Sequence, residues 1–298
     1  MTTSARARII TYLILTFALS SVFYWQIVGT GKMKMLPVFG LMWCPGVASL
    51  ITRLIFQRNL RGIGWGWGAT RWQALAYLLP PVMALVVYGL VWVTGIGGVS
   101  GEPLTAAVAR GAGVKLPLPA VLGMLATVGF LQSMVFALGE ELGWRGLLVP
   151  ELAGVTSFTN VALISGAVWS VYHYPLILFS NYTSGAPRWY ALLAFTAMVI
   201  ASSFVFAWFR LRSGSVWTAV ILHASHNLFI QEIFDPMTVD RGITKYITTE
   251  FGAGLTVAYC IAAWICWRKR GELEQGQAQE AVPAGVVDRS EAVAYPDL

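Results

Sequence analysis

Charged side chains are scarce in this sequence of 298 residues. Asp, Glu, Lys and Arg together make up 11% of it, whereas soluble domains carry roughly 25%. Hydrophobic residues make up 57%, so the composition excludes an ordinary soluble domain. It predicts a multi-pass membrane protein, in which charge is confined to loops and to functional positions within the bilayer.

Cysteine is rare, and clusters of basic residues are missing. The three cysteines, Cys44, Cys260 and Cys266, lie in apolar runs and are odd in number, which excludes a disulfide framework and a thiolate metal cluster. The formal net charge is +6, but Lys and Arg are spread over short loops and helix ends, where they act as topology signals. We therefore expect no nucleic-acid partner.

Apolar runs long enough to cross a bilayer recur along the chain. A spanning helix needs about 20 residues, and about eight runs approach that length. They lie near residues 9–28, 36–56, 73–95, 118–139, 159–180, 189–209, 214–234 and 250–267. The runs are continuous and lack the alternation of outer-membrane strands, so the predicted fold class is all-α, a polytopic bundle of about eight transmembrane helices.

The distribution of polar residues divides the chain into three parts. Residues 1–115 hold the first three runs and an interfacial segment, residues 116–267 hold a core with ionisable groups, and residues 268–298 form a polar tail. We expect the tail to be disordered, because it has few large apolar side chains. The arrangement of Lys and Arg favours both termini in the cytoplasm of a protein in the cell membrane.

Ionisable side chains in the core are the most informative residues of the sequence. Such groups are expensive within spanning helices and normally face a protein interior or a wet cavity. Every histidine of the chain lies in this part, together with two adjacent glutamates and an arginine. The candidates are Glu140, Glu141, Arg145, His173, His223, His226 and Asn227.

Helical spacing predicts which of these side chains share a face. Glu141 and Arg145 are four residues apart and can pair, whereas Glu140 is turned about 100° away and is left free to act. In "HASHN", His223 and Asn227 share one face. His226 lies off that face, and we expect it to pack or to support the others.

A buried carboxylate near imidazole and amide groups suits the activation of water. The glutamate would take the proton of the water molecule, and His and Asn donors or a metal would stabilise the oxyanion at an attacked carbonyl. Each element also has a structural interpretation. Glu141 with Arg145 forms an ion pair by spacing, and a histidine such as His173 often only bonds neighbouring helices.

Three motifs resemble those of one membrane protein family. "EELGWR" (Glu140, Glu141, Arg145) resembles EExxxR, "WSVYH" (Trp169 to His173) resembles FxxxH, and "HASHN" (His223 to Asn227) resembles HxxxN. These motifs, in this order, are those of the CAAX protease and bacteriocin-processing (CPBP) family, also called the ABI family. The type II CAAX prenyl endopeptidases are its best-known branch. Trp169 departs from the usual Phe, which bears on the shape of the pocket.

The resemblance implies an eight-helix intramembrane protease in which Glu140 activates water. It implies that Glu141 and Arg145 support Glu140, and that His173, His223 and Asn227 line the site. Glu140, His173 and His223 could also form a His₂Glu zinc set, although the sequence lacks HExxH; we favour chemistry without a metal. The implied substrate is a membrane peptide or a lipidated protein, and the implied surroundings are a lipid bilayer.

Two other classes of function stay open at this point. Glu140 and the histidines could form the proton relay of a coupled transporter, or the cavity could bind a peptide without cleaving it, as a bacteriocin-immunity protein would. A transporter should show broken helices in two related halves, and the sequence shows no such symmetry. A protein that only binds a peptide has no need of a free carboxylate beside His and Asn donors.

Overall fold

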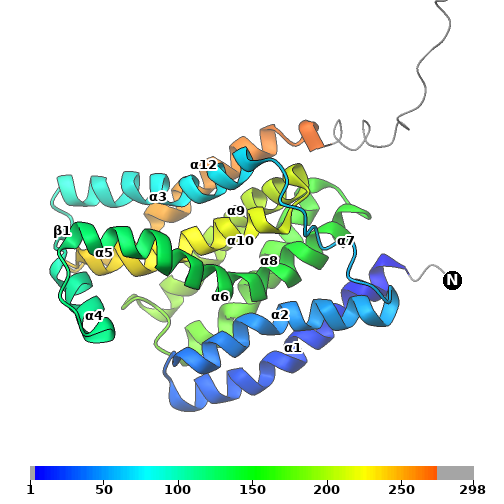
Figure 1. Cartoon of the computed structure of the whole chain (residues 1–298), viewed down its shortest axis with the longest axis horizontal. Coiled ribbons are helices and arrows are strands. Elements are labelled where there is room, and N and C mark those ends of the chain that lie inside the picture. The colour runs from blue at the N-terminus through cyan, green and yellow to red at the C-terminus, as the bar shows by residue number, and fades with distance from the viewer. Residues whose placement is uncertain (1–3, 274–298) are drawn as a thin grey trace, which may run out of the picture.

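Long helices fill the part of the chain that the computed structural model describes, residues 4–273 (Figure 1). The α-helices are α1 (Ala5–Thr30), α2 (Met35–Phe56), α3 (Thr70–Val93), α4 (Glu102–Ala112), α5 (Leu118–Met124), α6 (Phe130–Gly143), α7 (Val149–Ala153), α8 (Phe158–Phe179), α9 (Arg188–Ser213), α10 (Val216–His226), α11 (Asp235–Met237) and α12 (Ala253–Arg268). The predicted all-α membrane fold is therefore confirmed.

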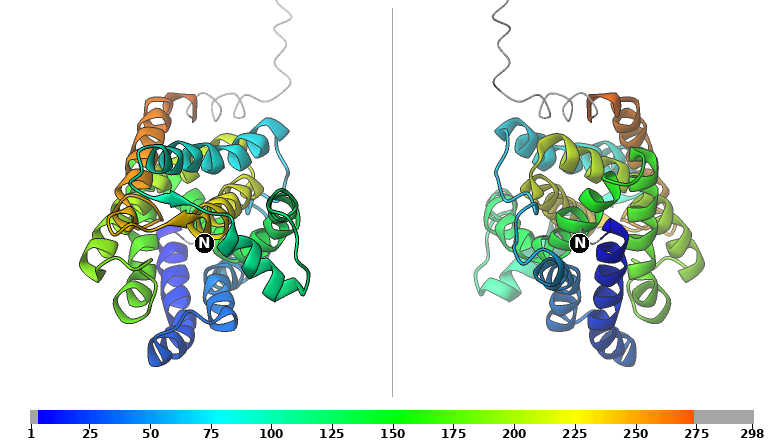
Figure 2. Two further views of the ribbon diagram at one scale, coloured as in Figure 1. Left: turned by 90° about the vertical axis from the view of Figure 1, so that its left-hand side faces the viewer. Right: turned by 90° about the vertical axis from the view of Figure 1, so that its right-hand side faces the viewer.

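The helices form a bundle in which two pairs of outer helices enclose the core. Figures 1 and 2 show α3 and α12 along one side and α1 with α2 along the opposite side, with α6, α8, α9 and α10 between them. α2 packs on α6, α8 packs on α9, and α10 contacts both α3 and α6. The motif-bearing helices α6, α8 and α10 thus lie in the interior of the bundle.

The predicted number of eight membrane spans is not confirmed. Within the described residues, six helical stretches are long and apolar enough to cross a membrane. The seventh predicted run, 214–234, is divided between α10 and the π-helical segment η3 (Asn227–Phe234), and the eighth, α12, has 16 residues. Both runs are helical as predicted, but α12 is shorter than the usual spanning length, and the seventh run is not among the six stretches.

The fourth predicted run is longer than the sequence suggests. We expected it to end near residue 139, but the helical stretch continues from Leu118 to Ala153. Glu140 therefore lies well inside a helical stretch and not at its end. The error arises because Glu140, Glu141 and Arg145 lower the local hydropathy, while burial in the bundle allows the helix to continue through them.

Two π-helical segments carry parts of the motifs. η2 (Trp144–Leu148) follows α6 directly and holds Arg145, and η3 begins at Asn227. π-Helical turns inside α-helices are frequent at functional sites, because they change the direction of the side chains that follow. A further π segment, η1 (Leu125–Gly129), separates α5 from α6.

Two buried arginines hold η2 in place. The Arg53 guanidinium donates to the Gly146 carbonyl over 2.7 Å, and the Arg210 Nε donates to the Arg145 carbonyl over 2.8 Å. Both arginines also bond carbonyl groups of the loop between α2 and α3, at Gly62 and Ile63. These hydrogen bonds satisfy two carbonyl groups of η2, and they connect the loop between α2 and α3 to η2.

Small residues allow α2 to approach α6 beside the glutamate pair. A Cβ atom added to Gly139 would lie 2.7 Å from the Met42 carbonyl oxygen, and one added to Gly143 would lie 2.5 Å from Pro45 Cβ. Gly139 and Gly143 are four residues apart and flank "EEL", which is the spacing that brings membrane helices together. Any larger residue at either position would push α2 away from the site.

A short antiparallel ladder and a tail segment lie outside the predicted pattern. β1 (Gly98–Val99) pairs with β2 (Thr238–Val239), which joins the loop after α3 to the loop after α11.

The predicted start of the disordered tail, at residue 268, is too early in the chain. Arg268 belongs to α12, and residues 271–273 form a helical turn. Glu272 in that turn pairs with Arg212. The remainder, 274–298, lies outside the described residues.

Candidate active site

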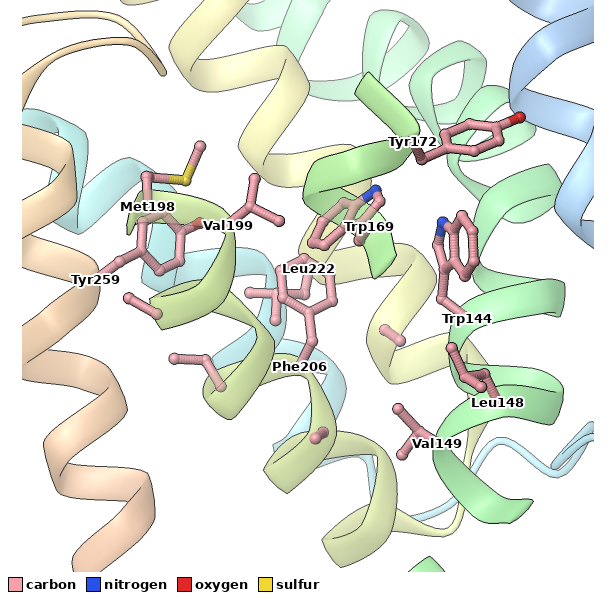
Figure 3. Packing of buried hydrophobic residues seen from close by; sticks show 14 of the residues in the cluster. Trp144, Leu148, Val149, Trp169, Tyr172, Met198, Val199, Phe206, Leu222 and Tyr259 are labelled. Atoms are coloured by element: carbon pink, nitrogen blue, oxygen red, sulfur yellow. The ribbon is translucent and has the colours of Figure 1, made fainter. Parts of the chain in front are cut away.

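The Glu140 carboxylate is held by two indole groups. Trp144 Nε1 donates to Glu140 Oε2 over 3.0 Å, and Trp169 Nε1 donates to the same oxygen over 2.8 Å. Figure 3 shows the two tryptophans side by side, Trp144 from η2 and Trp169 from α8. In the described part of the chain no hydrogen bond reaches Oε1, so this oxygen remains available as an acceptor. Glu140 is thus oriented, not free as predicted.

The predicted pair of Glu141 and Arg145 is confirmed. Arg145 donates to Glu141 Oε1 over 2.9 Å, and the two side chains are 1% and 0% exposed. The same Oε1 lies 2.8 Å from His223 Nδ1. The guanidinium also lies over the rings of Trp169 and Phe206, with 4.3 and 4.2 Å from Cζ to the ring centroids. Because Glu141 and Arg145 are both buried, each charge depends on its partner.

Hydrogen bonds at Nδ1 orient two histidines. His223 Nδ1 contacts the Glu141 carboxylate, and His173 Nδ1 lies 2.9 Å from the Trp169 carbonyl oxygen. A carboxylate and a carbonyl only accept, so the proton of each ring is on Nδ1. The second ring nitrogen, Nε2, is therefore the atom that either histidine can offer to a ligand or to water.

Asn227 is the first residue of η3, and its side-chain oxygen Oδ1 accepts a hydrogen bond from Gln231. Gln231 Nε2 lies 3.5 Å from Asn227 Oδ1 and 3.0 Å from Glu250 Oε2. Since Oδ1 accepts this hydrogen bond, the Asn227 carboxamide keeps its N–H groups for other partners. Asn227 can therefore serve as a hydrogen-bond donor.

One cavity brings the predicted site residues together. It has a volume of about 130 Å³, and Glu140, His173, His223 and Asn227 all line it. Glu141 and Arg145 do not line it; they lie behind the His223 ring and support it. Much of the remaining wall is apolar and comes from α2, α8 and α9, for instance Leu41, Leu176 and Val199. A volume of this size leaves room for several water molecules.

The geometry does not fit the zinc set that the sequence allowed. Among residues 4–273, no three His, Cys, Asp or Glu side chains are grouped closely enough to hold a metal ion. Glu140 Oε2 is also engaged by two indole donors. Imidazoles with a bonded Nδ1 are common metal ligands, but Glu140, His173 and His223 do not converge as a ligand set requires.

Several residues of the site escaped the sequence analysis. Trp144 and Trp169 were not predicted as donors, although Trp144 follows Glu140 by four residues and can reach it along the helix. His226, predicted to pack or support, lines the cavity, and its Nδ1 lies 2.8 Å from the Tyr259 hydroxyl. Glu250 also lines the cavity. In the sequence, Glu250 could have been noticed only as an isolated carboxylate beside an apolar run.

Comparison with known proteins points to the same segment of the chain. Residues 122–229 match the model of a family described as type II CAAX prenyl endopeptidase, Rce1-like. CAAX prenyl protease 2 of Methanococcus maripaludis is 31% identical over 94 residues, which cover 30% of this chain and 34% of the relative. The match thus spans about a third of that protein's length. All six predicted site residues fall within 122–229, the segment that is similar to this family of CAAX proteases.

Proposed function

We propose that this protein is an intramembrane endopeptidase in which Glu140 activates a water molecule. The observation that carries the proposal is the placement of Glu140. Its carboxylate is buried and fixed by two indole N–H groups at the wall of a cavity that His173, His223 and Asn227 also line. A carboxylate beside imidazole and amide groups at the wall of a cavity suits hydrolysis of a peptide bond.

In the first step Glu140 acts as the general base. Oε1 takes one proton of the water molecule, and the neutral His173 ring accepts a hydrogen bond from the other through Nε2. The hydroxide oxygen forms a bond to the carbonyl carbon of the substrate, and the carbonyl oxygen takes up the negative charge. The indole bonds to Oε2 keep the carboxylate in the orientation that this transfer needs.

The second step requires donors for the oxyanion and a proton for the leaving group. Asn227 donates through its carboxamide, and His223, which Glu141 holds at Nδ1, lines the cavity beside it. When the oxyanion collapses, the C–N bond breaks and the proton held by Glu140 passes to the amine that leaves. Glu141 and Arg145 thus serve catalysis through His223, without contacting the substrate.

For the substrate we propose a membrane peptide or a lipidated protein of the CAAX type. The cavity wall includes Met33, Val38 and Met198, whose side chains favour apolar groups over charged ones. The surrounding helices expose large apolar side chains, for example Leu85 on α3 and Leu193 on α9, as expected of a multi-pass protein in a cell membrane. A substrate that is itself anchored in the bilayer would reach the site from within the membrane.

The test is cleavage by the purified protein in liposomes. Lipidated and unlipidated CAAX peptides and a set of hydrophobic peptides are incubated with it, and mass spectrometry maps the products. We expect cleavage by the wild type and by Glu232→Gln, which changes an exposed glutamate outside the cavity. Glu140→Gln should yield no products, because an amide cannot take the proton. Equal products from Glu140→Gln would remove Glu140 as the base.

A further inference from the structure

Glu250 is a second buried carboxylate in the cavity, and the proposed reaction does not use it. It lies in the loop between the 3₁₀ turn η4 (Thr244–Tyr246) and α12, and is 6% exposed. It lines the same cavity as Glu140. Neither Glu250 nor Gln231 falls within residues 122–229, the segment that matches the known family. A buried carboxylate is retained only where its neighbours compensate for the lost hydration.

The contacts of Glu250 lead to two residues of the site. Gln231 Nε2 donates to Glu250 Oε2 over 3.0 Å and reaches Asn227 Oδ1 over 3.5 Å. An ionised carboxylate only accepts, so it selects the orientation of Gln231 in which the NH₂ group faces Glu250. That same NH₂ group then faces the oxygen of Asn227, and the Asn227 N–H groups are left for the cavity.

The second connection runs through Tyr182. Its hydroxyl interacts with the Glu250 carboxylate, and its ring centroid lies 6.2 Å from that of His173 at an interplanar angle of 31°. Phe251, the residue after Glu250, packs edge-on against the same Tyr182 ring at 5.0 Å. The loop that carries Glu250 therefore also limits the positions open to the His173 ring.

We infer that Glu250 is a positioning residue of the active site, which acts on Asn227 through Gln231 and on His173 through Tyr182. The inference rests on the proposed function for its role in catalysis, but the orientation of Asn227 is a property of the folded protein alone. With Glu250 ionised, the Asn227 carboxamide is held as a donor toward the cavity. Without that charge, the Gln231 amide is free to turn, and Asn227 loses its fixed orientation.

The charge of Glu250 makes this device sensitive to pH. Burial raises the pKa of Glu250 to about 7, and the bonds from Tyr182 and Gln231 oppose part of that effect. The other titratable groups that act on it are Asp235 and His223, with Tyr88 and Tyr259 on α3 and α12. Because the pKa is raised, Glu250 is neutral below about pH 7 and ionised above it. The orientation of Asn227 is therefore best defined above pH 7.

The test observes the Asn227 side chain directly. The chain contains four asparagines, at 59, 160, 181 and 227, so protein labelled with ¹⁵N-asparagine gives few side-chain NH₂ signals, and Asn227→Asp identifies the one of interest. We expect this signal to shift with pH in the wild type with a midpoint near 7. Glu250→Gln and Gln231→Met should each abolish the shift, and Glu232→Gln should preserve it. A wild-type signal without this midpoint, or the same shift in Glu250→Gln, would overturn the inference.

Kinetics supply the second readout. Gln at position 250 resembles the neutral form of Glu250, so kcat of Glu250→Gln should equal that of the wild type below about pH 6. By pH 8 it should be about tenfold lower, with KM unchanged, because one catalytic donor is poorly held. If the ratio of the wild-type kcat to the kcat of Glu250→Gln did not vary with pH, the inference would be contradicted. If the wild type cleaves no peptide, the proposed function fails, and the NMR titration still decides the role of Glu250.

Discussion

Glu140 and Glu141 are neighbours in the sequence, yet their surroundings differ in kind. Glu140 meets neutral donors, the indoles of Trp144 and Trp169, and lines the cavity. Glu141 contacts the charged Arg145 and the His223 ring and is fully buried behind the cavity. The helix turns the two carboxylates into different environments. This difference supports the proposal that Glu140 acts on the substrate, whereas Glu141 stabilises the fold and holds His223.

The largest effect on stability is expected from Glu141→Gln. This change leaves Arg145 buried without its counter-ion, which typically costs about 3–5 kcal/mol. We expect the melting temperature in detergent to fall by many degrees and cleavage to fall with it, since His223 loses its support. Glu272→Gln is the control, because its pair with Arg212 is 40% exposed on the glutamate side and such pairs contribute about 1 kcal/mol or less. Equal melting temperatures for the two variants would refute the buried pair.

Asn227→Ala should remove much of the activity while leaving the fold intact. Loss of one oxyanion donor typically lowers kcat by about 10²–10³. Asn227→Asp should be at least as slow, because a carboxylate adds negative charge beside the oxyanion. The control is Asn160→Ala, at an exposed position near the start of α8. A kcat of Asn227→Ala within threefold of wild type would contradict the assignment of Asn227 as a donor.

Trp169→Phe should have a smaller effect. It restores the aromatic residue usual in the family's second motif and removes one of the two indole bonds to Glu140. We expect kcat to fall by about fivefold to tenfold, because Trp144 still holds the carboxylate. Trp43→Phe is a matched control, since the buried Trp43 indole nitrogen has no hydrogen-bond partner among residues 4–273. Identical kinetics for the two variants would show that the Trp169 indole does not orient Glu140.

Much of the fold was predictable because hydropathy along the chain reports the environment of each helix. The pairing of Glu141 with Arg145 was predictable too, since both lie on one helix and the spacing alone brings them together. The indole bond from Trp169 was not, because it joins α6 to α8 and depends on how the helices pack. The same holds for Gln231 and Glu250, which meet only after the chain folds back beside η3.

The π segments also escaped the sequence analysis. A π-helical turn has no residue signature comparable to a helix cap, and Arg53 and Arg210 stabilise η2 from other parts of the chain. One local signal was present: Gly139 and Gly143 flank the glutamate pair with the spacing of close helix packing. This spacing of the two glycines predicts that another helix packs closely against the glutamate pair.

The smallest effect is expected from removal of metal ions. Because Glu140, His173 and His223 are not grouped as ligands, we expect cleavage rates to stay unchanged after exhaustive chelation. Elemental analysis of the purified protein should find no stoichiometric zinc. Loss of activity that zinc restores, together with one bound zinc per chain, would show that the site rearranges into a metal centre.

The different roles of Glu140 and Glu141 are tested most directly by the cleavage rates and melting temperatures of Glu140→Gln and Glu141→Gln, measured side by side. We expect Glu140→Gln to melt within about 2 °C of wild type and to cleave at least about 10³-fold more slowly, because it loses the base and no charged partner. We expect Glu141→Gln to melt at a much lower temperature. Cleavage by Glu140→Gln within tenfold of the wild-type rate, or a loss of stability as large as that of Glu141→Gln, would contradict these roles.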